Sequence, residues 1–381
     1  MTQPKFKQLE RAYGFDEVSL VPGDVTVNPG QTDISFSLGD LTFSIPILAA
    51  AMDAVVDPSF AVMFNKLGGL AVLNLEGIQT RYENADEILE QIAQTPETEV
   101  TSLLQKIYSQ PIKENLIGER IGVIRKAGAV CVASITPANT KWLAPIAKDA
   151  GMDVLVVQST VTTARHISKS YRGLILPELC QMMSLPIIVG NCCSYSVALE
   201  LMRAGIDGIL VGVGPGAACT TREVIGVGVP QITATFNCAA ARETHLKESG
   251  KRVSVITDGG IRTGGELCKT FAAGADAVMI GSPLAQAKEA PGRGYHWGMA
   301  HSHVSLPRGT RVRVGTIATL EQILFGPTSV TDGTQNMVGA LHTGMGVCGA
   351  RNIKEMHRVR MVIAPAIKTE GKYFQATQNV P

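Results

Sequence analysis

The stretch Ala150-Gly151-Met152-Asp153-Val154 recurs twice in this sequence, as Ala204-Gly205-Ile206-Asp207-Gly208 and as Ala273-Gly274-Ala275-Asp276-Ala277. Looser copies are Lys66–Leu70 and Lys126–Val130. In every copy a glycine follows a helical pattern, where a left-handed C-cap is expected, and a short apolar run comes directly after it. The repeat therefore predicts a series of helix-to-strand junctions.

The apolar runs at these junctions are continuous rather than alternating, which is typical of parallel strands buried on both faces. Eight runs have this character: Ile45–Ala49, Leu70–Leu73, Ala129–Ser134, Val154–Gln158, Pro186–Val189, Gly208–Val211, Val253–Thr257 and Ala277–Ile280. Amphipathic segments such as Ser196–Arg203 and Glu266–Ala273 separate most of them. Eight strands that alternate with helices predict an α/β fold, a (β/α)8 TIM barrel. An open doubly wound sheet is the alternative, because a strand count alone does not prove closure.

Two long additions interrupt the alternation, and we expect residues 1–381 to form one barrel domain that carries both. Residues 74–126 are too many for one crossover helix, which predicts an inserted helical segment. Residues 285–339 are rich in Gly, Pro and Arg and lack clear periodicity. Long irregular loops of compact domains are often functional, and this one leaves the C-terminal end of a strand, so we expect an active-site lid.

The composition narrows the class of protein. Hydrophobic residues make up 45% and charged residues 18%, which predicts a large core, and the net charge of +1 gives no reason to expect nucleic acid as a partner. The polar N-terminus lacks the apolar region of a signal peptide, and no apolar run reaches the length of a membrane span. Eight cysteines without a CxxC pair indicate buried thiols in a reducing cytoplasm.

A glycine-rich segment after the sixth strand presents the strongest candidate for a nucleophile. Gly212–Ala218 is followed by Cys219, Thr220, Thr221 and Arg222. Small and hydroxyl neighbours, with an arginine nearby, are surroundings in which a thiolate is stabilised and a flat substrate can approach. A buried structural cysteine is the alternative, and the glycine loop favours the catalytic interpretation.

Two further loops predict a phosphate site, because the loops after strands seven and eight of a barrel commonly bind phosphate. The first holds Asp258 and Gly260, and the second holds Gly281 and Ser282. Glycines allow the backbone to approach the phosphate closely, and the serine adds a hydroxyl donor. Asp258 repels phosphate, so a sugar hydroxyl is its expected partner. Ordinary tight turns are the alternative.

Other strand ends add candidate contacts. Met52, after the first strand, is a candidate wall against a flat base, with a core methionine as the commoner explanation. Asn191 follows the fifth strand, and Tyr295 lies where the lid begins, with a hydroxyl that suits a ligand. The seven histidines form no HExxH or similar spacing, so the sequence predicts no zinc site.

The chain resembles the IMP dehydrogenase/GMP reductase family along nearly its whole length. The motifs that carry the resemblance are Phe15-Asp16-Glu17-Val18, Ala50-Ala51-Met52-Asp53, Gly214-Pro215-Gly216, Cys219-Thr220-Thr221-Arg222, Gly226–Gln231, Asp258-Gly259-Gly260-Ile261, Glu289-Ala290-Pro291-Gly292 and Gly344-Met345-Gly346. The resemblance implies attack of the Cys219 thiolate on the purine C2, a covalent thioimidate, and hydride exchange with NADH or NADPH.

The resemblance also implies a role for each candidate residue. Thr221 lies beside the catalytic thiol of Cys219, and Asp258 holds the ribose. The residues expected to bind the rest of the nucleotide are Met52, Gly260, Gly281, Ser282, Tyr295, Gly298 and Met299. Those expected to contact the nicotinamide cofactor are Gln158 and Asn191, and a potassium ion is expected at the carbonyls of Gly214, Gly216 and Cys219. A homotetramer or an octamer is implied as well.

Departures from the family pattern bear on the reaction. The insertion at 74–126 is too short for the paired CBS modules of IMP dehydrogenases, and Ala217 replaces a serine. Gln158 stands where an acid is usual. The lid lacks the Arg-Tyr pair that activates water in IMP dehydrogenases, and it also lacks the acid of GMP reductases, near whose place Arg308 lies.

These departures leave several activities open. The compact length and the missing Arg-Tyr pair favour a GMP reductase, which forms IMP and ammonia from GMP. The alternative is an IMP dehydrogenase that activates water with another lid group, Arg308 or Arg311. A non-catalytic regulator that binds purine nucleotides is a second alternative, and a flavin-dependent barrel oxidoreductase is a third.

Overall fold

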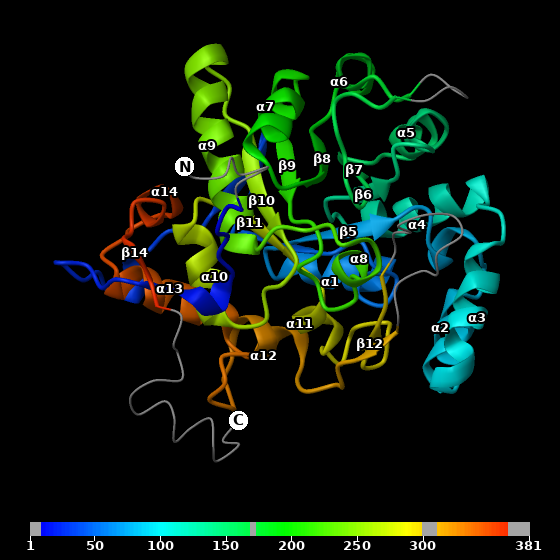
Figure 1. The fold of residues 1–381 in the computed structure, drawn as a ribbon. Helices are drawn as coiled ribbons and strands as arrows, with labels where there is room; N and C mark the ends of the chain where they lie inside the picture. The colour runs from blue at the N-terminus through cyan, green and yellow to red at the C-terminus, as the bar shows by residue number, and fades with distance from the viewer. Residues whose placement is uncertain (1–8, 168–172, 299–310, 365–381) are drawn as a thin grey trace, which may run out of the picture.

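The computed structural model describes residues 9–167, 173–298 and 311–364. Eight parallel strands close into a barrel in the order β10-β11-β4-β5-β6-β7-β8-β9 (Figure 1). Their bounds are β4 Ile47–Ala49, β5 Leu70–Asn74, β6 Val132–Ile135, β7 Val154–Gln158, β8 Ile187–Cys192, β9 Gly208–Val211, β10 Ser254–Asp258 and β11 Ala277–Ile280. Each coincides with one of the eight predicted runs. The prediction of a closed (β/α)8 barrel is confirmed, and the open sheet is excluded.

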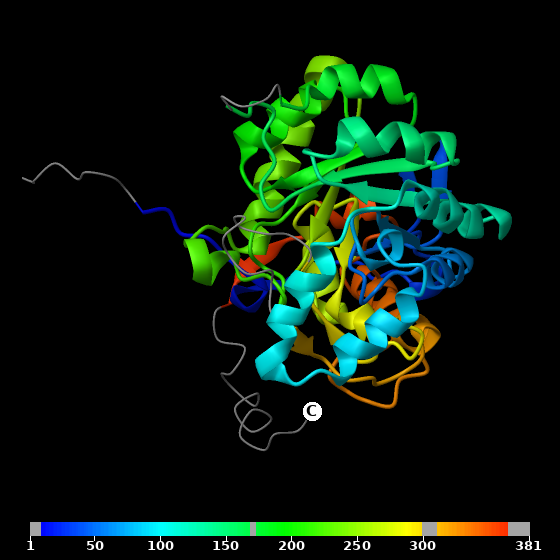
Figure 2. The same ribbon diagram turned by 90° about the vertical axis from the view of Figure 1, so that its right-hand side faces the viewer.

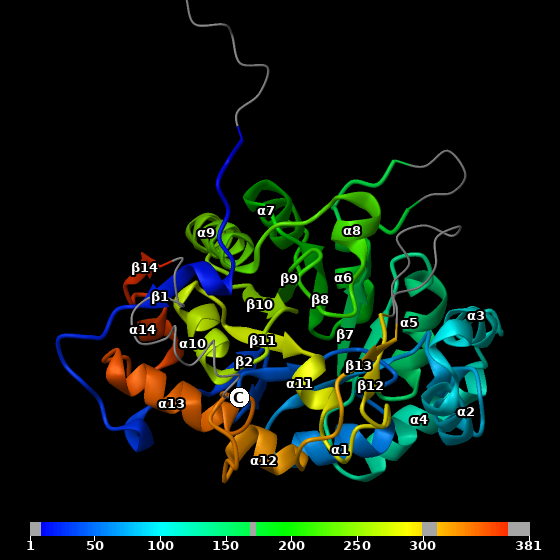
Figure 3. The ribbon, with the colours of Figure 1, turned by 60° about the horizontal axis from the view of Figure 1, so that its bottom comes forward.

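Helices surround the barrel, as Figure 3 shows from its lower side. Those of the outer ring are α1 Pro58–Lys66, α4 Glu114–Lys126, α5 Thr140–Asp149, α6 Leu176–Met183, α7 Tyr195–Arg203, α9 Gln231–Ser249, α10 Gly264–Ala272 and α13 Met337–Val347. Shorter helices are α8 Thr221–Ile225, α11 Ser282–Ala285, α12 Leu320–Phe325 and α14 Ile353–Met356. Within the described ranges, no helix is both long enough and apolar enough to cross a membrane.

Apolar side chains fill the barrel, and a hairpin closes the end at which the barrel strands begin. The hairpin consists of β2 Phe36–Leu38 and β3 Leu41–Phe43. Its buried side chains share one cluster with residues of the barrel strands, among them Leu48, Val132 and Ile256. A second, larger cluster lies between the barrel and the outer helices. Because the hairpin covers the N-terminal ends of the strands, a ligand is expected at their C-terminal ends.

The two long additions contain more regular structure than the sequence predicted. The first carries α2 Ala85–Gln94 and α3 Glu97–Tyr108, which project beside the barrel ahead of the crossover helix α4 (Figure 2, cyan). The region predicted as an irregular lid contains a two-stranded hairpin, β12 Tyr295–His296 with β13 Val312–Arg313, and also α12. Helix α12 has six residues and begins with a capping box, so it is too short to produce a visible period.

A third two-stranded pair joins distant parts of the chain. Strand β1 Val18–Leu20 pairs antiparallel with β14 Met361–Ile363. Three short 3-10 turns complete the described elements: Phe15–Glu17, Pro29–Gln31 and Ile78–Thr80. The N-terminal and C-terminal segments therefore lie together on the flank of the barrel.

The repeated junctions have the predicted backbone and an additional role for their aspartates. Gly151, Gly205 and Gly274 have φ of +99°, +100° and +107°, values that favour glycine. Asp153 donates its main-chain N–H to the Cys131 carbonyl at 2.8 Å, while its carboxylate accepts the N–H of the same cysteine at 2.8 Å. This reciprocal pair of bonds fastens the start of β7 to the start of β6.

The same reciprocal bonds occur at the other two junctions. Asp207 exchanges bonds of 2.9 Å and 2.9 Å with Ile187, which joins β9 to β8. Asp276 exchanges bonds of 2.8 Å and 2.9 Å with Val255, which joins β11 to β10. The glycine of the repeat was predicted to end a helix, and its aspartate, which had no predicted role, links the start of one strand to the start of the preceding one.

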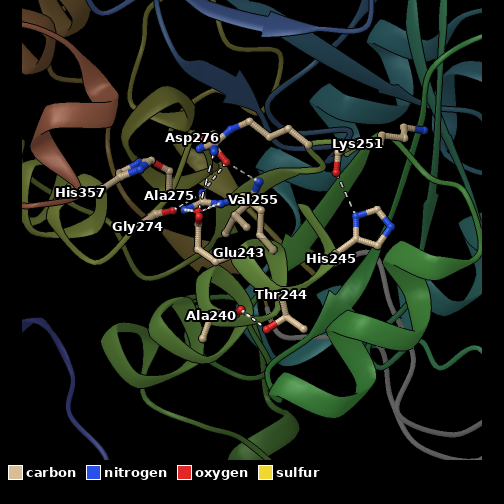
Figure 4. A network of polar contacts seen from close by, with 12 residues as sticks. Ala240, Glu243, Thr244, His245, Lys251, Val255, Gly274, Ala275, Asp276 and His357 are labelled. Atoms are coloured by element: carbon tan, nitrogen blue, oxygen red, sulfur yellow. Dashed lines mark hydrogen bonds and ion pairs between the residues drawn. The ribbon is translucent and has the colours of Figure 1, made fainter. Parts of the chain in front are cut away.

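Charged groups surround the third of these aspartates (Figure 4). Arg242, whose side chain is 3% exposed, donates to Asp276 at 2.7 Å and to the Gly274 carbonyl at 2.8 Å. Arg252 contacts the other carboxylate oxygen at 2.6 Å. Burial raises the pKa of Asp276, but the two guanidinium groups outweigh burial and hold the pKa below its usual value of 3.8.

We expect Asp276→Asn to destabilise the protein by about 3–5 kcal/mol, because Arg242, whose side chain is 3% exposed, would lose its buried carboxylate and keep the half-exposed Glu243 as its ion-pair partner. Asp207→Asn is the matched control: its partner Lys251 is 44% exposed, so the loss should be about 1 kcal/mol or less. Urea unfolding of both variants at neutral pH measures the difference. The lowered pKa means that the advantage of wild type over Asp276→Asn exists above pH 3.8 and shrinks below it. Equal losses in the two variants would contradict this assignment.

Candidate active site

Three polar side chains from different strands meet at the open end of the barrel. Gln158 ends β7, Asn191 lies in β8, and Asp258 ends β10. The Gln158 amide donates to Asn191 Oδ1 at 3.1 Å and to Asp258 Oδ2 at 3.0 Å. The Asn191 amide donates to the same carboxylate oxygen at 2.7 Å. Gln158 and Asn191, predicted to contact the cofactor, therefore form one hydrogen-bonded group with Asp258, predicted to bind the ribose.

This environment changes the acidity of Asp258. Burial raises its pKa to about 6, and the hydrogen bonds from Asn191 and Gln158 lower it only in part. Both amides bond to Oδ2, and within the described ranges no donor is bonded to Oδ1. The carboxylate therefore keeps one oxygen for a hydroxyl group of a ligand.

The predicted nucleophile lies on the loop that follows β9. Cys219 is half-buried, and its thiol donates to the Thr221 hydroxyl at 3.1 Å. Its main-chain N–H donates to the Gly216 carbonyl at 3.0 Å, which makes a tight turn just before helix α8. The structure thus brings Cys219 and Thr221 together and leaves the thiol accessible to a ligand.

Arg222, expected to stabilise the Cys219 thiolate, also has structural contacts. Its guanidinium donates to the Val229 carbonyl at 2.7 Å. Its side chain fills the space beside Gly214 and Gly228, where an added Cβ would lie 2.5 Å from it in each case. These contacts close the base of the cysteine loop, so Arg222 supports the backbone that presents the thiol.

The predicted phosphate loop after β10 packs directly on the cysteine loop. Gly259 and Gly260 have φ of +87° and +82°, and a Cβ on either would lie 3.2 Å from the Pro215 side chain. Gln231, which the sequence analysis did not assign, donates to the Val211 and Asp258 carbonyls at 2.8 and 2.9 Å. This buried amide holds the ends of β9 and β10 together and keeps the two loops adjacent.

The end of β11 completes the opposite side of the opening. Met52 is partly buried, and its sulfur lies so near Gly281 that a Cβ there would approach it to 3.0 Å. The next residue, Ser282, is half-buried and starts helix α11. Its hydroxyl lies 3.1 Å from Nε2 of His296, a residue that the sequence analysis did not single out.

Tyr295 is not brought to this group. Its ring lies under the Arg311 guanidinium, at 4.4 Å from the ring centroid, and packs on the cluster formed by the helical insertion. Arg311 also donates to the Ile92 carbonyl of α2. Gly298 is described and half-buried, whereas Met299 lies outside the described residues, as does Arg308.

The helical insertion contacts both Met52's loop and the β12–β13 hairpin. Tyr108 of α3 donates its hydroxyl proton to the buried carboxylate of Asp53 at 2.6 Å, and the Ile78 N–H donates to the same oxygen at 2.9 Å. Trp297, fully buried, donates its indole N–H to the Tyr108 hydroxyl at 2.8 Å. The insertion therefore supports the wall of the opening from behind.

Two further features of the described chain lie outside this group of residues. The Arg-Tyr dipeptide at Arg81-Tyr82 is held in the insertion by bonds to the Glu76 and Ile107 carbonyls, so it is committed to local structure. A groove of about 1170 Å³ lies on the flank between α10 and α13, and none of the predicted site residues lines it. Within the described ranges, no group of three or more His, Cys, Asp or Glu side chains is suited to a metal ion.

Comparison with known proteins places the chain among its relatives. The profile of the IMP dehydrogenase/GMP reductase domain matches residues 12–306. The chain belongs to this family. Family members are oxidoreductases that bind purine nucleotides and use nicotinamide cofactors. The expectation drawn from the motifs is therefore confirmed at the level of the family.

Individual relatives extend over nearly the whole chain. An uncharacterized oxidoreductase of Mycobacterium tuberculosis is 37% identical over 93% of this chain and 96% of its own. An IMP dehydrogenase of Cryptosporidium parvum is 28% identical over 92% of this chain and 91% of its own. The crystal structure of an IMP dehydrogenase/GMP reductase-like protein from Corynebacterium glutamicum has a TM-score of 0.90 and 33% identity, over 96% of this chain and 97% of that one.

We expect kcat/KM for a purine nucleotide to rise as the pH increases through about 6, because only ionised Asp258 accepts hydrogen bonds with both oxygens. Gln158→Leu removes a donor to this carboxylate, so its pKa and the inflection should move to higher pH. Gln94→Leu, on the exposed face of α2, is the matched control and should leave the profile unchanged. An inflection that stays in place in Gln158→Leu would contradict the assignment.

Proposed function

We propose that this chain oxidises IMP to XMP with a nicotinamide dinucleotide, through a covalent bond between Cys219 and the purine C2. The observation that carries the proposal is the half-buried Cys219 thiol, 3.1 Å from the Thr221 hydroxyl, on a loop packed against the one that carries Asp258. The S–H donates to this hydroxyl, which gives the thiol proton a path away from the sulfur as the thiolate forms.

The reaction balances with groups from the chain and from its substrates. The thiolate of Cys219 adds to C2, and a hydride then leaves C2. The nicotinamide cofactor, when bound, accepts that hydride. The thioimidate left on Cys219 is hydrolysed by water, which adds an oxygen to C2 and returns the thiol, with release of XMP. The proton of the Cys219 thiol leaves through the Thr221 hydroxyl, to which the S–H donates at 3.1 Å, and reaches solvent, so one H⁺ is released for each hydride transferred. In the hydrolysis, the attacking water supplies the proton that restores the thiol.

Nucleotide binding follows the ends of the last two barrel strands. Asp258 would accept a ribose hydroxyl at its unoccupied oxygen. Gly260, Gly281 and Ser282 would hold the 5′-phosphate, because glycine backbone and a hydroxyl donor suit an anion. Met52 would form the apolar wall beside the base.

The cofactor site fits the residues at the ends of β7 and β8. The Gln158 amide is used by Asn191 and Asp258, so its carbonyl oxygen is the group left to accept an N–H from the carboxamide of a nicotinamide. The expected potassium site has less support: the Gly216 carbonyl already accepts the Cys219 N–H. We therefore derive no step from a cation.

Two observations bear on the direction of the reaction: the length of the chain and the proton-transfer groups in 285–339. Compact length favoured a GMP reductase, but the Cryptosporidium parvum IMP dehydrogenase aligns over 91% of its own length with 92% of this chain, so length does not separate the two activities. Residues 285–339 lack both the Arg-Tyr pair of IMP dehydrogenases and the acid of GMP reductases, so neither group decides the direction. The named activity of this relative therefore favours oxidation of IMP.

GMP reduction is the second candidate. The observation that favours it is the absence of an Arg-Tyr pair from 285–339, because reductive deamination needs no activated water. Arg311, one of the groups considered for water activation, is engaged with the Tyr295 ring and the Ile92 carbonyl. A homotetramer, the assembly implied by the resemblance, accompanies either candidate as part of the proposal.

The decisive assay follows absorbance at 340 nm with IMP plus NAD(P)⁺ and, separately, with GMP plus NAD(P)H. We expect a gain of absorbance with IMP. Cys219→Ala should lower the rate by about 10³-fold or more. Cys180→Ala, a half-buried thiol on α6, is the control and should change the rate less than about twofold.

Other results would replace the proposal. Loss of absorbance with GMP alone would establish the reductase. Nucleotide binding without turnover in either assay would indicate the non-catalytic regulator, and a yellow purified protein would indicate a flavin enzyme. Full activity of Cys219→Ala would reject the covalent mechanism for both directions.

A further inference from the structure

His296 is a buried polar residue that the proposed mechanism does not use. It is 2% exposed, and its Nε2 lies 3.1 Å from the Ser282 hydroxyl oxygen. Its other ring nitrogen, Nδ1, is buried and has no hydrogen-bond partner among the described residues. Leaving a buried polar atom unpaired costs about 1–3 kcal/mol, so such an atom calls for an explanation.

The alternation of strand β12 explains how the histidine reaches the serine. Successive side chains of a strand point to opposite faces. Tyr295 faces the helical insertion and packs under Arg311, so His296 faces the opposite way, toward the start of α11. In the hairpin, His296 rather than Tyr295 therefore contacts the predicted phosphate loop.

The protonation of His296 determines what Ser282 can do. Burial lowers the pKa of His296 to about 4, so the ring is neutral at neutral pH and carries one N–H. A proton on Nδ1 would leave a buried N–H without an acceptor, which is rare in folded proteins. A proton on Nε2 instead donates to the serine oxygen. In that tautomer the serine keeps its own hydroxyl proton for another acceptor.

We propose that His296 is a positioning residue for the phosphate monoester of the nucleotide, which fixes the Ser282 hydroxyl as a donor directed at the ligand. The inference rests on the proposed function, which places a 5′-nucleotide at this opening and its phosphate at Ser282. A hydroxyl oxygen that already accepts a hydrogen bond donates more strongly, because the two bonds polarise each other. The arrangement presents an anion with a neutral hydroxyl donor.

The test compares IMP with inosine, which lacks the phosphate, by calorimetric titration of the full-length protein. Ser282→Ala should weaken IMP binding by about ten- to hundredfold, the range for a hydrogen bond to a charged group. His296→Leu should lose most of the same factor, and His296→Gln, which retains an N–H donor, should recover part of it. The double variant Ser282→Ala/His296→Leu should bind IMP no more weakly than Ser282→Ala, because the histidine acts through the serine. Inosine affinity should stay constant throughout.

Three results would overturn the assignment. They are unchanged IMP affinity in His296→Leu, equal losses of IMP and inosine affinity, and losses that multiply in the double variant. If His296→Leu does not fold, His296→Gln still tests the assignment. A His296→Gln protein that binds IMP as weakly as Ser282→Ala would also reject the donor role of the histidine. If wild type bound neither IMP nor GMP, the proposed function itself would fail, which is a distinct outcome from a negative result at His296.

Discussion

At three junctions of the barrel, one aspartate exchanges two hydrogen bonds with the residue that starts the preceding strand. Asp153, Asp207 and Asp276 each donate a main-chain N–H and accept one with the carboxylate. Parallel strands have no tight turn to set their register, so a fixed contact at the start of each pair must do so. The register decides which side chains reach the open end, as between β7 and β8, where Gln158 lies opposite Gly190, next to Asn191.

Each end of the barrel has a buried aspartate, and the two differ in how their charge is compensated. Asp276, at the closed end, lies between Arg242 and Arg252, which keep it ionised and hold strands and helices in place. Asp258, at the open end, is bonded through its side chain to two amides among the described residues, and burial raises its pKa to about 6. Full charge compensation suits a structural group, whereas incomplete compensation leaves a carboxylate that responds to a ligand.

Much of this arrangement could be predicted from the sequence, because it rests on local patterns. The glycines of the repeat mark helix ends through their backbone requirement, and the apolar runs mark strands, so all eight barrel strands were found. Asn191 and Asp258 followed from their place after strands, and Gln158 followed from the resemblance to a family. Cys219 and Thr221 were found through the glycine loop and the resemblance to a family.

The remaining features depend on contacts between distant segments, which no local pattern encodes. A two-residue strand has no period, so the sequence could not show that His296 rather than Tyr295 contacts Ser282. Gln231 bonds two carbonyl groups, and backbone partners leave no trace in side-chain types. Arg222 was interpreted from its nearness to Cys219 in the chain, whereas its side chain turns away to Val229.

The cluster that joins the helical insertion to β12 has a consequence for cooperativity. Trp297 and Tyr295 share buried contacts with α2 and α3, and they are linked through Tyr108 to Asp53. Segments that share one small core gain and lose structure as a single unit. The insertion and the base of the hairpin thus form one cooperative subdomain on the rim of the barrel. Local opening of α3 would release the hairpin and expose that side of the opening without unfolding a single barrel strand.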